Sequence, residues 1–167
     1  MALGKEVTIR RATEKDAAPA AALLRDSITQ LCVADHQNDP VALEQWLRNK
    51  TPEHFLRWLA NPEMCIVVAE MEAVLCGVGA IRKNGELDFC YILPGRERLG
   101  IGRAILSTLE AQARSWGLGK LHLISTCTAR PFYERHGFVP TGEESASKFG
   151  LRDYHYVKHL TTGAEAG

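Results

Sequence analysis

The sequence has no long apolar run and no excess of charge of either sign. No hydrophobic stretch approaches the roughly 20 residues of a membrane-spanning helix. Lys and Arg together number 20, as do Asp and Glu, so the formal net charge is zero. Proteins that bind nucleic acid or anionic membranes normally carry a basic excess. The first sixteen residues are charged and lack the apolar core of a signal peptide. We therefore expect a cytoplasmic protein with no nucleic-acid or membrane partner.

Cysteine and histidine clusters are also missing. The five cysteines are scattered and form no CxxC pair, which favours reduced thiols in a cytosolic protein. The six histidines include no HExxH motif and no Cys/His group at ligand spacing, so we expect no metal. What the chain does have is 46% hydrophobic residues over 167 positions, which predicts a single domain, 1–167, with a sizeable core.

Hydrophobic periodicity predicts an alternation of strands and helices, with a loop over 34–40. Strand patterns cover 7–12, 64–70, 74–82, 86–93, 120–126, a segment starting at 138, and 153–160. Helix patterns cover about 14–33, two short segments opened by Asp39-Pro40 and Thr51-Pro52, about 100–116, and a short segment within 129–137. The strand–helix–strand unit across 86–126 implies a parallel strand pair within a mixed sheet.

The stretch RERLGIGRAIL, residues 96–106, places two glycines and three arginines at the start of a helix. The first N–H groups of a helix have no partner inside it and carry partial positive charge, so bare backbone there favours an anion. A dinucleotide fingerprint would need a third glycine and a later acidic residue, and a Walker loop would need GxxxxGK, but neither pattern is present. From these residues alone, a phosphate site and a purely structural turn both stay open.

Two motifs together give a more specific indication. YILPGRERLGIGRAIL and, about 30 residues later, TARPFYERHGF resemble the signature motifs of the GCN5-related N-acetyltransferase superfamily, and in particular its bacterial TARPFY-type members. The resemblance covers about 7–160. It implies an α+β fold with a central mixed, mostly antiparallel sheet flanked by helices and a splayed parallel strand pair at the cofactor site. It also implies transfer of an acetyl group from acetyl-CoA to a primary amine by direct attack.

The resemblance also implies how acetyl-CoA (coenzyme A) is bound. Backbone amides of the glycine loop would hold the pyrophosphate, the strand before the loop would bind the pantetheine arm, and two residues of the second motif would add polar contacts. Glu97 departs from the Gln or Arg usual in the family, and we expect it to point outward and pair with an arginine. The implied cofactor-binding residues are Cys90, Tyr91, Ile92, Arg98, Leu99, Gly100, Ile101, Gly102, Arg103, Thr126 and Arg130.

Catalysis by such a protein needs a base for the amine and an acid for the leaving thiolate. Tyr133 stands where the family places its general acid, and Glu86 stands where the histone-acetylating branch carries its base. Asp88 would face the same side as Glu86 if the strand is regular, and an ordered water relay is a third alternative for the base. The residues alone favour a core aromatic at Tyr133 and a solvated residue at Glu86. We expect structural roles for His122 and His136 and a solvated charge at Arg135.

The acceptor amine, a small molecule or a peptide, is not specified by the motifs. Residues 31–62 and a loop at 143–152 are the segments that we expect to select it. Trp46, Phe55 and Trp58 could line an acceptor pocket, but their helical spacing favours core packing. A homodimer stays open, as does a non-catalytic acyl-CoA-binding or regulatory domain on the same fold.

Overall fold

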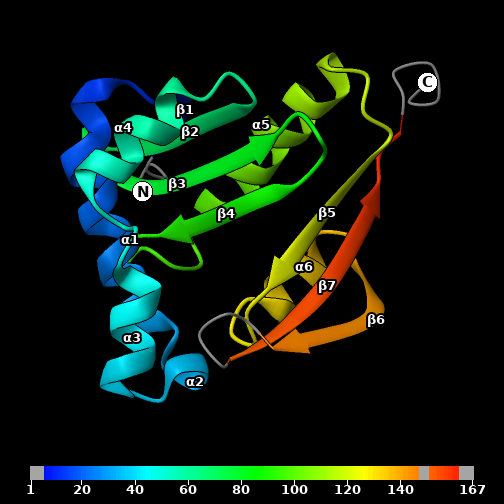
Figure 1. Ribbon diagram of the computed structural model, residues 1–167. Coiled ribbons are helices and arrows are strands. Elements are labelled where there is room, and N and C mark those ends of the chain that lie inside the picture. The colour runs from blue at the N-terminus through cyan, green and yellow to red at the C-terminus, as the bar shows by residue number, and fades with distance from the viewer. Residues whose placement is uncertain (1–5, 147–150, 162–167) are drawn as a thin grey trace, which may run out of the picture.

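The computed structural model describes residues 6–146 and 151–161 (Figure 1). Within these ranges, no helix is long and apolar enough to cross a membrane. The strands are β1 (Thr8–Arg11), β2 (Met64–Met71), β3 (Val74–Arg82), β4 (Leu87–Ile92), β5 (Lys120–Ser125), β6 (Val139–Ala146) and β7 (Arg152–His159). The helices are the 3-10 turn η1 (Glu14–Asp16), α1 (Ala17–Leu31), α2 (Val33–His36), α3 (Pro40–Leu47), α4 (Pro52–Ala60), α5 (Ile101–Ser115) and α6 (Arg130–Arg135).

The strands form two antiparallel sheets that meet at one end and separate at the other. One sheet has the order β1-β2-β3-β4 and the other the order β5-β7-β6. Glu86, the residue before β4, forms a parallel bridge with His122 of β5, and the His122 N–H donates to the Gly85 carbonyl at 3.0 Å. Beyond that bridge the two strands diverge (Figure 1). The predicted mixed α+β fold with a splayed parallel pair is confirmed.

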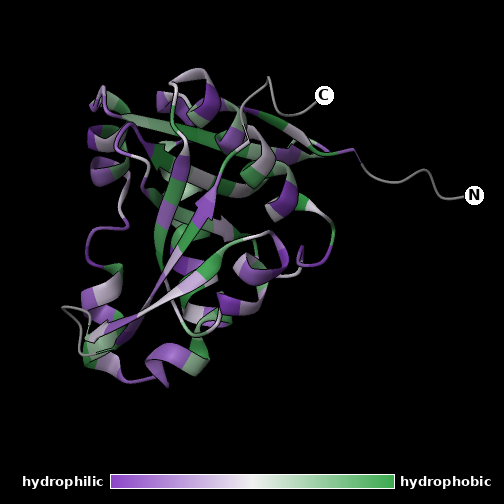
Figure 2. Cartoon of the chain, turned by 90° about the vertical axis from the view of Figure 1, so that its right-hand side faces the viewer, coloured by the Kyte–Doolittle hydropathy of each residue, from purple (hydrophilic) through white to green (hydrophobic). Residues whose placement is uncertain are grey.

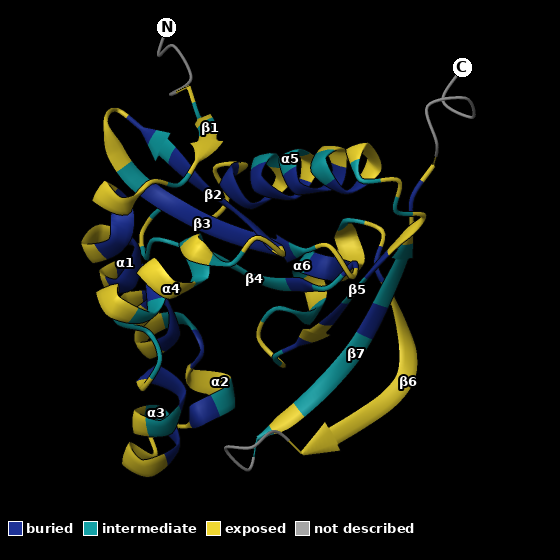
Figure 3. Cartoon of the chain, turned by 45° about the horizontal axis from the view of Figure 1, so that its top comes forward, coloured by how far each residue is buried: buried dark blue, intermediate teal, exposed yellow. Residues whose placement is uncertain are grey.

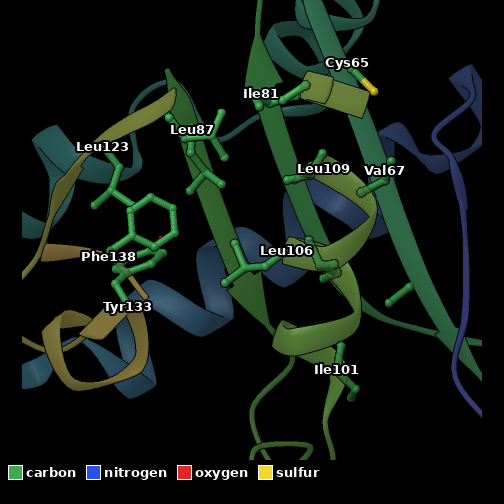
Figure 4. Packing of buried hydrophobic residues seen from close by; sticks show 14 of the residues in the cluster. Cys65, Val67, Ile81, Leu87, Ile101, Leu106, Leu109, Leu123, Tyr133 and Phe138 are labelled. Atoms are coloured by element: carbon green, nitrogen blue, oxygen red, sulfur yellow. The ribbon is translucent and has the colours of Figure 1, made fainter. Parts of the chain in front are cut away.

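Helices cover both faces of the first sheet. α1 and α4 pack on one face, where Leu24 and Phe55 meet Val68 of β2. α5 packs on the other face through Ile101, Leu106 and Leu109 (Figure 4). Hydrophobic and hydrophilic residues alternate along the helices, as the bands of colour in Figure 2 show. β2 and β3 are buried along most of their length, whereas β6 is exposed throughout (Figure 3).

Glycine in β3 allows α5 to lie close to the sheet. A Cβ atom at Gly77 would lie 2.8 Å from side-chain atoms of both Ile101 and Ile105. This separation is shorter than packed atoms tolerate, so a larger residue would push the helix outward. The small residue therefore fixes how deep the start of α5 sits against β3 and next to β4.

Two predicted loops differ from the structure. Residues 33–36 form the short helix α2, because the buried His36 side chain has backbone partners: Nδ1 accepts from the Asn38 N–H at 3.0 Å and Nε2 lies 3.0 Å from the Ile28 carbonyl. Of the predicted loop 143–152, residues 143–146 belong to β6 and residue 152 begins β7. The remaining predicted loop residues include 147–150, which lie outside the described residues.

An ion pair links α5 to the second sheet. Lys158 of β7 donates to Glu110 of α5 at 2.6 Å, with side-chain exposures of 23% and 12%. Removing one partner of a buried pair leaves the other charge desolvated, so Glu110→Ala should lower the free energy of unfolding by about 2 kcal/mol. Urea denaturation measures this loss. Glu44→Ala, in the exposed helical pair with Arg48, is the matched control and should change stability little. Equal effects of the two variants would contradict a structural role for the buried pair.

Candidate active site

A cavity of about 860 Å³ opens where β4 and β5 diverge. β4 forms one wall, the start of α5 and the loop before it form the floor, and α6 with the turn after β5 forms the opposite wall. The C-terminal end of α1 closes one side. The residues that line it are Ser27, Leu31, Cys32, Asp88, Phe89, Cys90, Tyr91, Ile92, Arg96, Glu97, Arg98, Gly100, Ile101, Gly102, Arg103, Ile124, Ser125, Thr126, Thr128, Ala129, Phe132, Tyr133, Arg135 and His136.

β4 is irregular at its start, and this irregularity separates the two candidate bases. Ala80 pairs with Phe89 and the next residue of β3, Ile81, pairs with Leu87, so Asp88 is the extra residue of a β-bulge. Asp88 and Glu86 were expected to face the same side only if the strand is regular, and that condition is not met, because a bulge redirects side chains. Asp88 lines the cavity with Tyr133, whereas Glu86 lines a separate cavity of about 530 Å³. His122 lines that second cavity as well.

Asp88 combines burial with a cationic neighbour. Arg82 Nε donates to Asp88 Oδ2 at 2.7 Å, and the Asp88 side chain is 15% exposed. Desolvation by burial raises the pKa of Asp88 above its ordinary value of 3.8, although the charge and hydrogen bond of Arg82 oppose the shift. A carboxylate with a raised pKa accepts a proton more readily than an exposed one.

Tyr133 is both a core aromatic and a cavity-lining residue. It is 6% exposed, and its ring lies 5.2 Å from the Phe132 ring and 5.6 Å from the Phe138 ring, with Leu123 near by (Figure 4). Burial raises the pKa of its phenol well above the ordinary value of 10. The hydroxyl is therefore protonated at neutral pH and can donate a proton into the cavity.

The glycine loop begins α5 with exposed backbone. Gly100 precedes the helix with φ of +82°, in the left-handed region that favours glycine, and no heavy atom lies within 4 Å of a Cβ placed there. A Cβ at Gly102 would lie 2.8 Å from two ring atoms of Phe132, so Gly102 also lets α6 pack against α5. Arg98, Ile101 and Arg103 line the cavity with the two glycines, whereas Leu99 is 49% exposed and does not line it.

Two residues next to the loop differ from expectation. Glu97 Oε2 accepts the Gly95 N–H at 2.8 Å, and among the described residues it has no arginine partner, so the expected pairing is wrong. Arg96 was missed by sequence reasoning. It lines the cavity, and its Nη1 atom is buried with no hydrogen-bond partner in the described part of the chain. The signal that could have identified Arg96 is its position, immediately before the place where the family motif has Gln or Arg.

The residues of the second motif are divided between the cavity and the sheet behind it. Thr126 lines the cavity, and its Oγ1 accepts the Ala129 N–H at 3.1 Å. Arg130 does not line it: its Nε donates to the Tyr156 hydroxyl at 2.9 Å, and its guanidinium lies 3.9 Å from the Tyr154 ring centroid. The implied phosphate contact of Arg130 therefore has no support in this geometry.

Two side chains at the C-terminal end of α6 line the cavity, although neither was expected there from the sequence. Arg135 and His136 both line the cavity, and His136 Nδ1 lies 2.8 Å from the Phe132 carbonyl. His122, which was expected to be structural, has both ring nitrogens buried without a hydrogen-bond partner among the described residues.

The segments expected to select the acceptor contribute little to the described cavity. From 31–62, Leu31 and Cys32 line it. Trp46 and Phe55 are buried in the core, and Trp58 packs beside Phe55, so core packing is confirmed for these aromatics. Within the described residues, no group of three or more His, Cys, Asp or Glu side chains is placed to hold a metal ion.

Comparisons with known proteins identify relatives of this chain by sequence. The family model described as an acetyltransferase (GNAT) domain matches residues 32–160. The amino-acid acetyltransferase of Pseudomonas putida strain GB-1 is 31% identical over 97 residues, which are 55% of this chain and 22% of that protein. The IAA acetyltransferase of Azospirillum brasilense is 30% identical over 95 residues, 52% of this chain and 62% of that protein. The chain therefore spans only part of the length of the curated relatives that it matches.

Solved structures share the fold. A GCN5-related N-acetyltransferase from Rhodopseudomonas palustris superposes with a TM-score of 0.83 at 20% identity, over 96% of this chain and 99% of that one. The PaiA N-acetyltransferase from Thermoplasma acidophilum, solved in complex with coenzyme A, gives a TM-score of 0.75 at 19% identity, over 93% and 99% of the two chains. Because the family model covers more than half of the sequence, the chain belongs to the GNAT acetyltransferase family.

Proposed function

We propose that this protein is an acetyl-CoA-dependent N-acetyltransferase that acetylates a primary amine. The observation that carries the proposal is the meeting of three features in one cavity: the bare start of α5, the half-buried carboxyl of Asp88 and the protonated phenol of Tyr133. Family membership supports the reaction class. The coenzyme A in the Thermoplasma structure and the name of the Pseudomonas relative support the cofactor and an amine acceptor.

The residues at the start of α5 suit the pyrophosphate of coenzyme A. The first N–H groups of the helix are free of intrahelical partners, and Gly100 leaves open space beside them. Arg98 and Arg103 line the same region, and the unpartnered Nη1 of Arg96 adds a buried cationic donor. These groups would attract and orient a diphosphate, and the carboxylate of Glu97, which lines the same cavity, accepts the Gly95 N–H.

β4 suits the amide-bearing pantetheine arm. It is the last strand of its sheet, so the backbone groups of Cys90 to Ile92 that face away from β3 have no strand partner among the described residues where β5 has diverged. An unpaired strand edge binds an extended ligand through main-chain hydrogen bonds. A backbone N–H of this segment would also stabilise negative charge that develops on the acetyl carbonyl oxygen.

When bound, acetyl-CoA supplies an activated acetyl thioester to the cavity. Asp88, or a water that it orients, accepts the proton that the acceptor ammonium must lose before its nitrogen can attack. Tyr133 donates its phenolic proton to the departing thiolate, and the second proton that the acceptor nitrogen loses on becoming an amide restores the phenol. The proton held by Asp88 returns to solvent. The raised pKa of Asp88 increases the proton affinity of the base, and the raised pKa of Tyr133 keeps the phenol protonated before the transfer.

Asp88→Asn and Glu86→Gln distinguish the two candidate bases. Asp88→Asn should lower kcat/KM by about 10²–10⁴-fold, the usual range for a general base. Glu86→Gln should leave it within about threefold, because Glu86 lines the other cavity. In the wild type, activity should fall as the pH drops through the raised pKa of Asp88, since protonation removes the base.

The measurement is a pH profile of kcat/KM for each variant. Loss of the acidic limb in Asp88→Asn supports Asp88 as the base. An unchanged profile in that variant would assign the proton to a water relay that does not depend on Asp88. A large loss in Glu86→Gln alone would return the role to Glu86.

A further inference from the structure

Asp35 connects the two walls of the active-site cavity. It lies on α2, which follows α1 on the side of the first sheet, and it contacts the turn that follows β5 of the second sheet. Asp35 Oδ1 accepts the Cys127 N–H at 2.7 Å. Oδ2 accepts the Thr128 N–H at 3.1 Å and also the Thr128 hydroxyl. One carboxylate therefore takes three hydrogen bonds from a segment more than ninety residues away, at the open side of the strand pair.

Its own helix holds Asp35 in place. The neighbouring His36 is 1% exposed, and its Nδ1 accepts the Asn38 N–H, so the ring proton lies on Nε2 and faces the Ile28 carbonyl. The Asp35 N–H donates to the Cys32 carbonyl at 2.9 Å. Because His36 and the backbone of Asp35 itself are both anchored to the end of α1, the carboxylate is held by the first sheet and its helices.

On the other wall, the bonded turn leads directly to Tyr133. Thr126 Oγ1 accepts the Ala129 N–H at 3.1 Å, and the Tyr133 N–H donates to the Ala129 carbonyl at 3.2 Å. The segment from Thr126 to Tyr133 is thus a turn followed by one helical turn, with hydrogen bonds along its length. Among the described residues, the Tyr133 hydroxyl itself has no hydrogen-bond partner, so the position of α6 determines where the hydroxyl lies.

We propose that Asp35 is a positioning residue that holds α6, and through it the Tyr133 hydroxyl, at the correct distance from β4. This inference rests on the proposed role of Tyr133 as the proton donor. A carboxylate suits the task because both of its oxygens accept, and hydrogen bonds to a charged acceptor are the stronger ones. Asn has nearly the same shape but only one acceptor oxygen, so Asp35→Asn loosens the connection without leaving a large cavity.

A kinetic double-mutant cycle tests the connection between the two residues. Asp35→Asn should lower the single-turnover rate about tenfold and change the acetyl-CoA Kd little, because all the implied cofactor residues except Thr126 and Arg130 lie on β4, on α5 or in the loop between them, and these are not displaced. In the Tyr133→Phe background, the same Asp35→Asn change should alter the rate less than about twofold, since no hydroxyl remains to be positioned. A merely structural role for Asp35 would give additive effects instead.

Asp39→Asn is the matched control. Asp39 caps α3 on the same side of the molecule and accepts the Val41 N–H at 3.1 Å, but it has no bond to the turn before α6. Asp39→Asn should lower the free energy of unfolding about as much as Asp35→Asn does and leave the single-turnover rate unchanged. Amide hydrogen exchange without any ligand adds a readout independent of activity: the Cys127 and Thr128 amides should exchange faster in Asp35→Asn and as in the wild type in Asp39→Asn.

Each outcome separates this inference from the proposed function. A full rate in Asp35→Asn, additive losses in the cycle, or unchanged amide exchange would overturn the positioning role while leaving Tyr133 as the acid. A full rate in Tyr133→Phe would instead overturn the proposed acid, and the positioning role with it. If Asp35→Asn does not fold, Thr128→Val removes one of the three donors from the opposite side and should give a smaller loss, restored by Thr128→Ser.

Discussion

Tyr133→Phe should lower the single-turnover rate of acetyl transfer by about 10²-fold or more, with the Kd for acetyl-CoA little changed. The ring is packed between Phe132 and Phe138, and phenylalanine preserves that packing. Only the hydroxyl is lost, and with it the proton that the leaving thiolate takes. Because burial raises the pKa of Tyr133 well above 10, the wild type should lose no activity through this group on the alkaline side of neutrality.

Rapid-quench kinetics and calorimetry, run on the same protein, measure the rate and the affinity. Tyr154→Phe is the matched control, since it removes a hydroxyl from a tyrosine that does not line the cavity. The denaturation midpoint of both variants shows whether the fold is kept. A Tyr133→Phe variant with the wild-type rate would exclude a proton donor at this position and leave Tyr133 as a core aromatic.

Gly100→Glu should weaken acetyl-CoA binding by about 10²-fold or more. The new carboxylate would occupy the open space beside the first N–H groups of α5, where it would repel the pyrophosphate and take its place. Gly100 is a sharper test than Gly102, because any side chain at Gly102 would first collide with Phe132. The loss at Gly100→Glu therefore reports on the ligand more than on the packing of α6.

Two controls separate charge from backbone strain. Gly100→Ala has the same unfavourable positive φ but adds no charge, and it should bind acetyl-CoA nearly as tightly as the wild type. Gly117→Glu places the same side chain at the other end of α5, where φ is +79° and no heavy atom lies within 4 Å of the added Cβ. Equal affinities of Gly100→Glu and Gly117→Glu in calorimetry would refute an anion site at the start of α5.

Local sequence patterns predicted most of the fold because the relevant interactions are local. The apolar runs of β2 and β3 predict strands that are buried on both faces, and the helical spacing of Ile105, Leu109 and Ala113 fixes which side of α5 is buried. The two glycines and the following apolar run likewise marked the start of α5. These features depend on residues within one or two turns of each other.

What the sequence did not predict depends on contacts between distant segments. The bulge at Asp88 arises from the register of β4 against β3, and a one-residue change there decides which carboxylate enters the cavity. Arg130 resembled a phosphate ligand in the motif, but Tyr154 and Tyr156, more than twenty residues later, hold its guanidinium. The helix α2 forms in a polar segment because His36 finds buried backbone partners.

The most direct test of the account is an assay of thiol release from acetyl-CoA across a panel of primary amines that includes free amino acids, with the acetylated product identified by mass. The account predicts amine-dependent release of thiol, matched one to one by an N-acetylated product, and loss of both in Gly100→Glu. Tight binding of acetyl-CoA with no amine-dependent release across the panel would contradict it, and would assign the chain to the non-catalytic acyl-CoA-binding proteins instead.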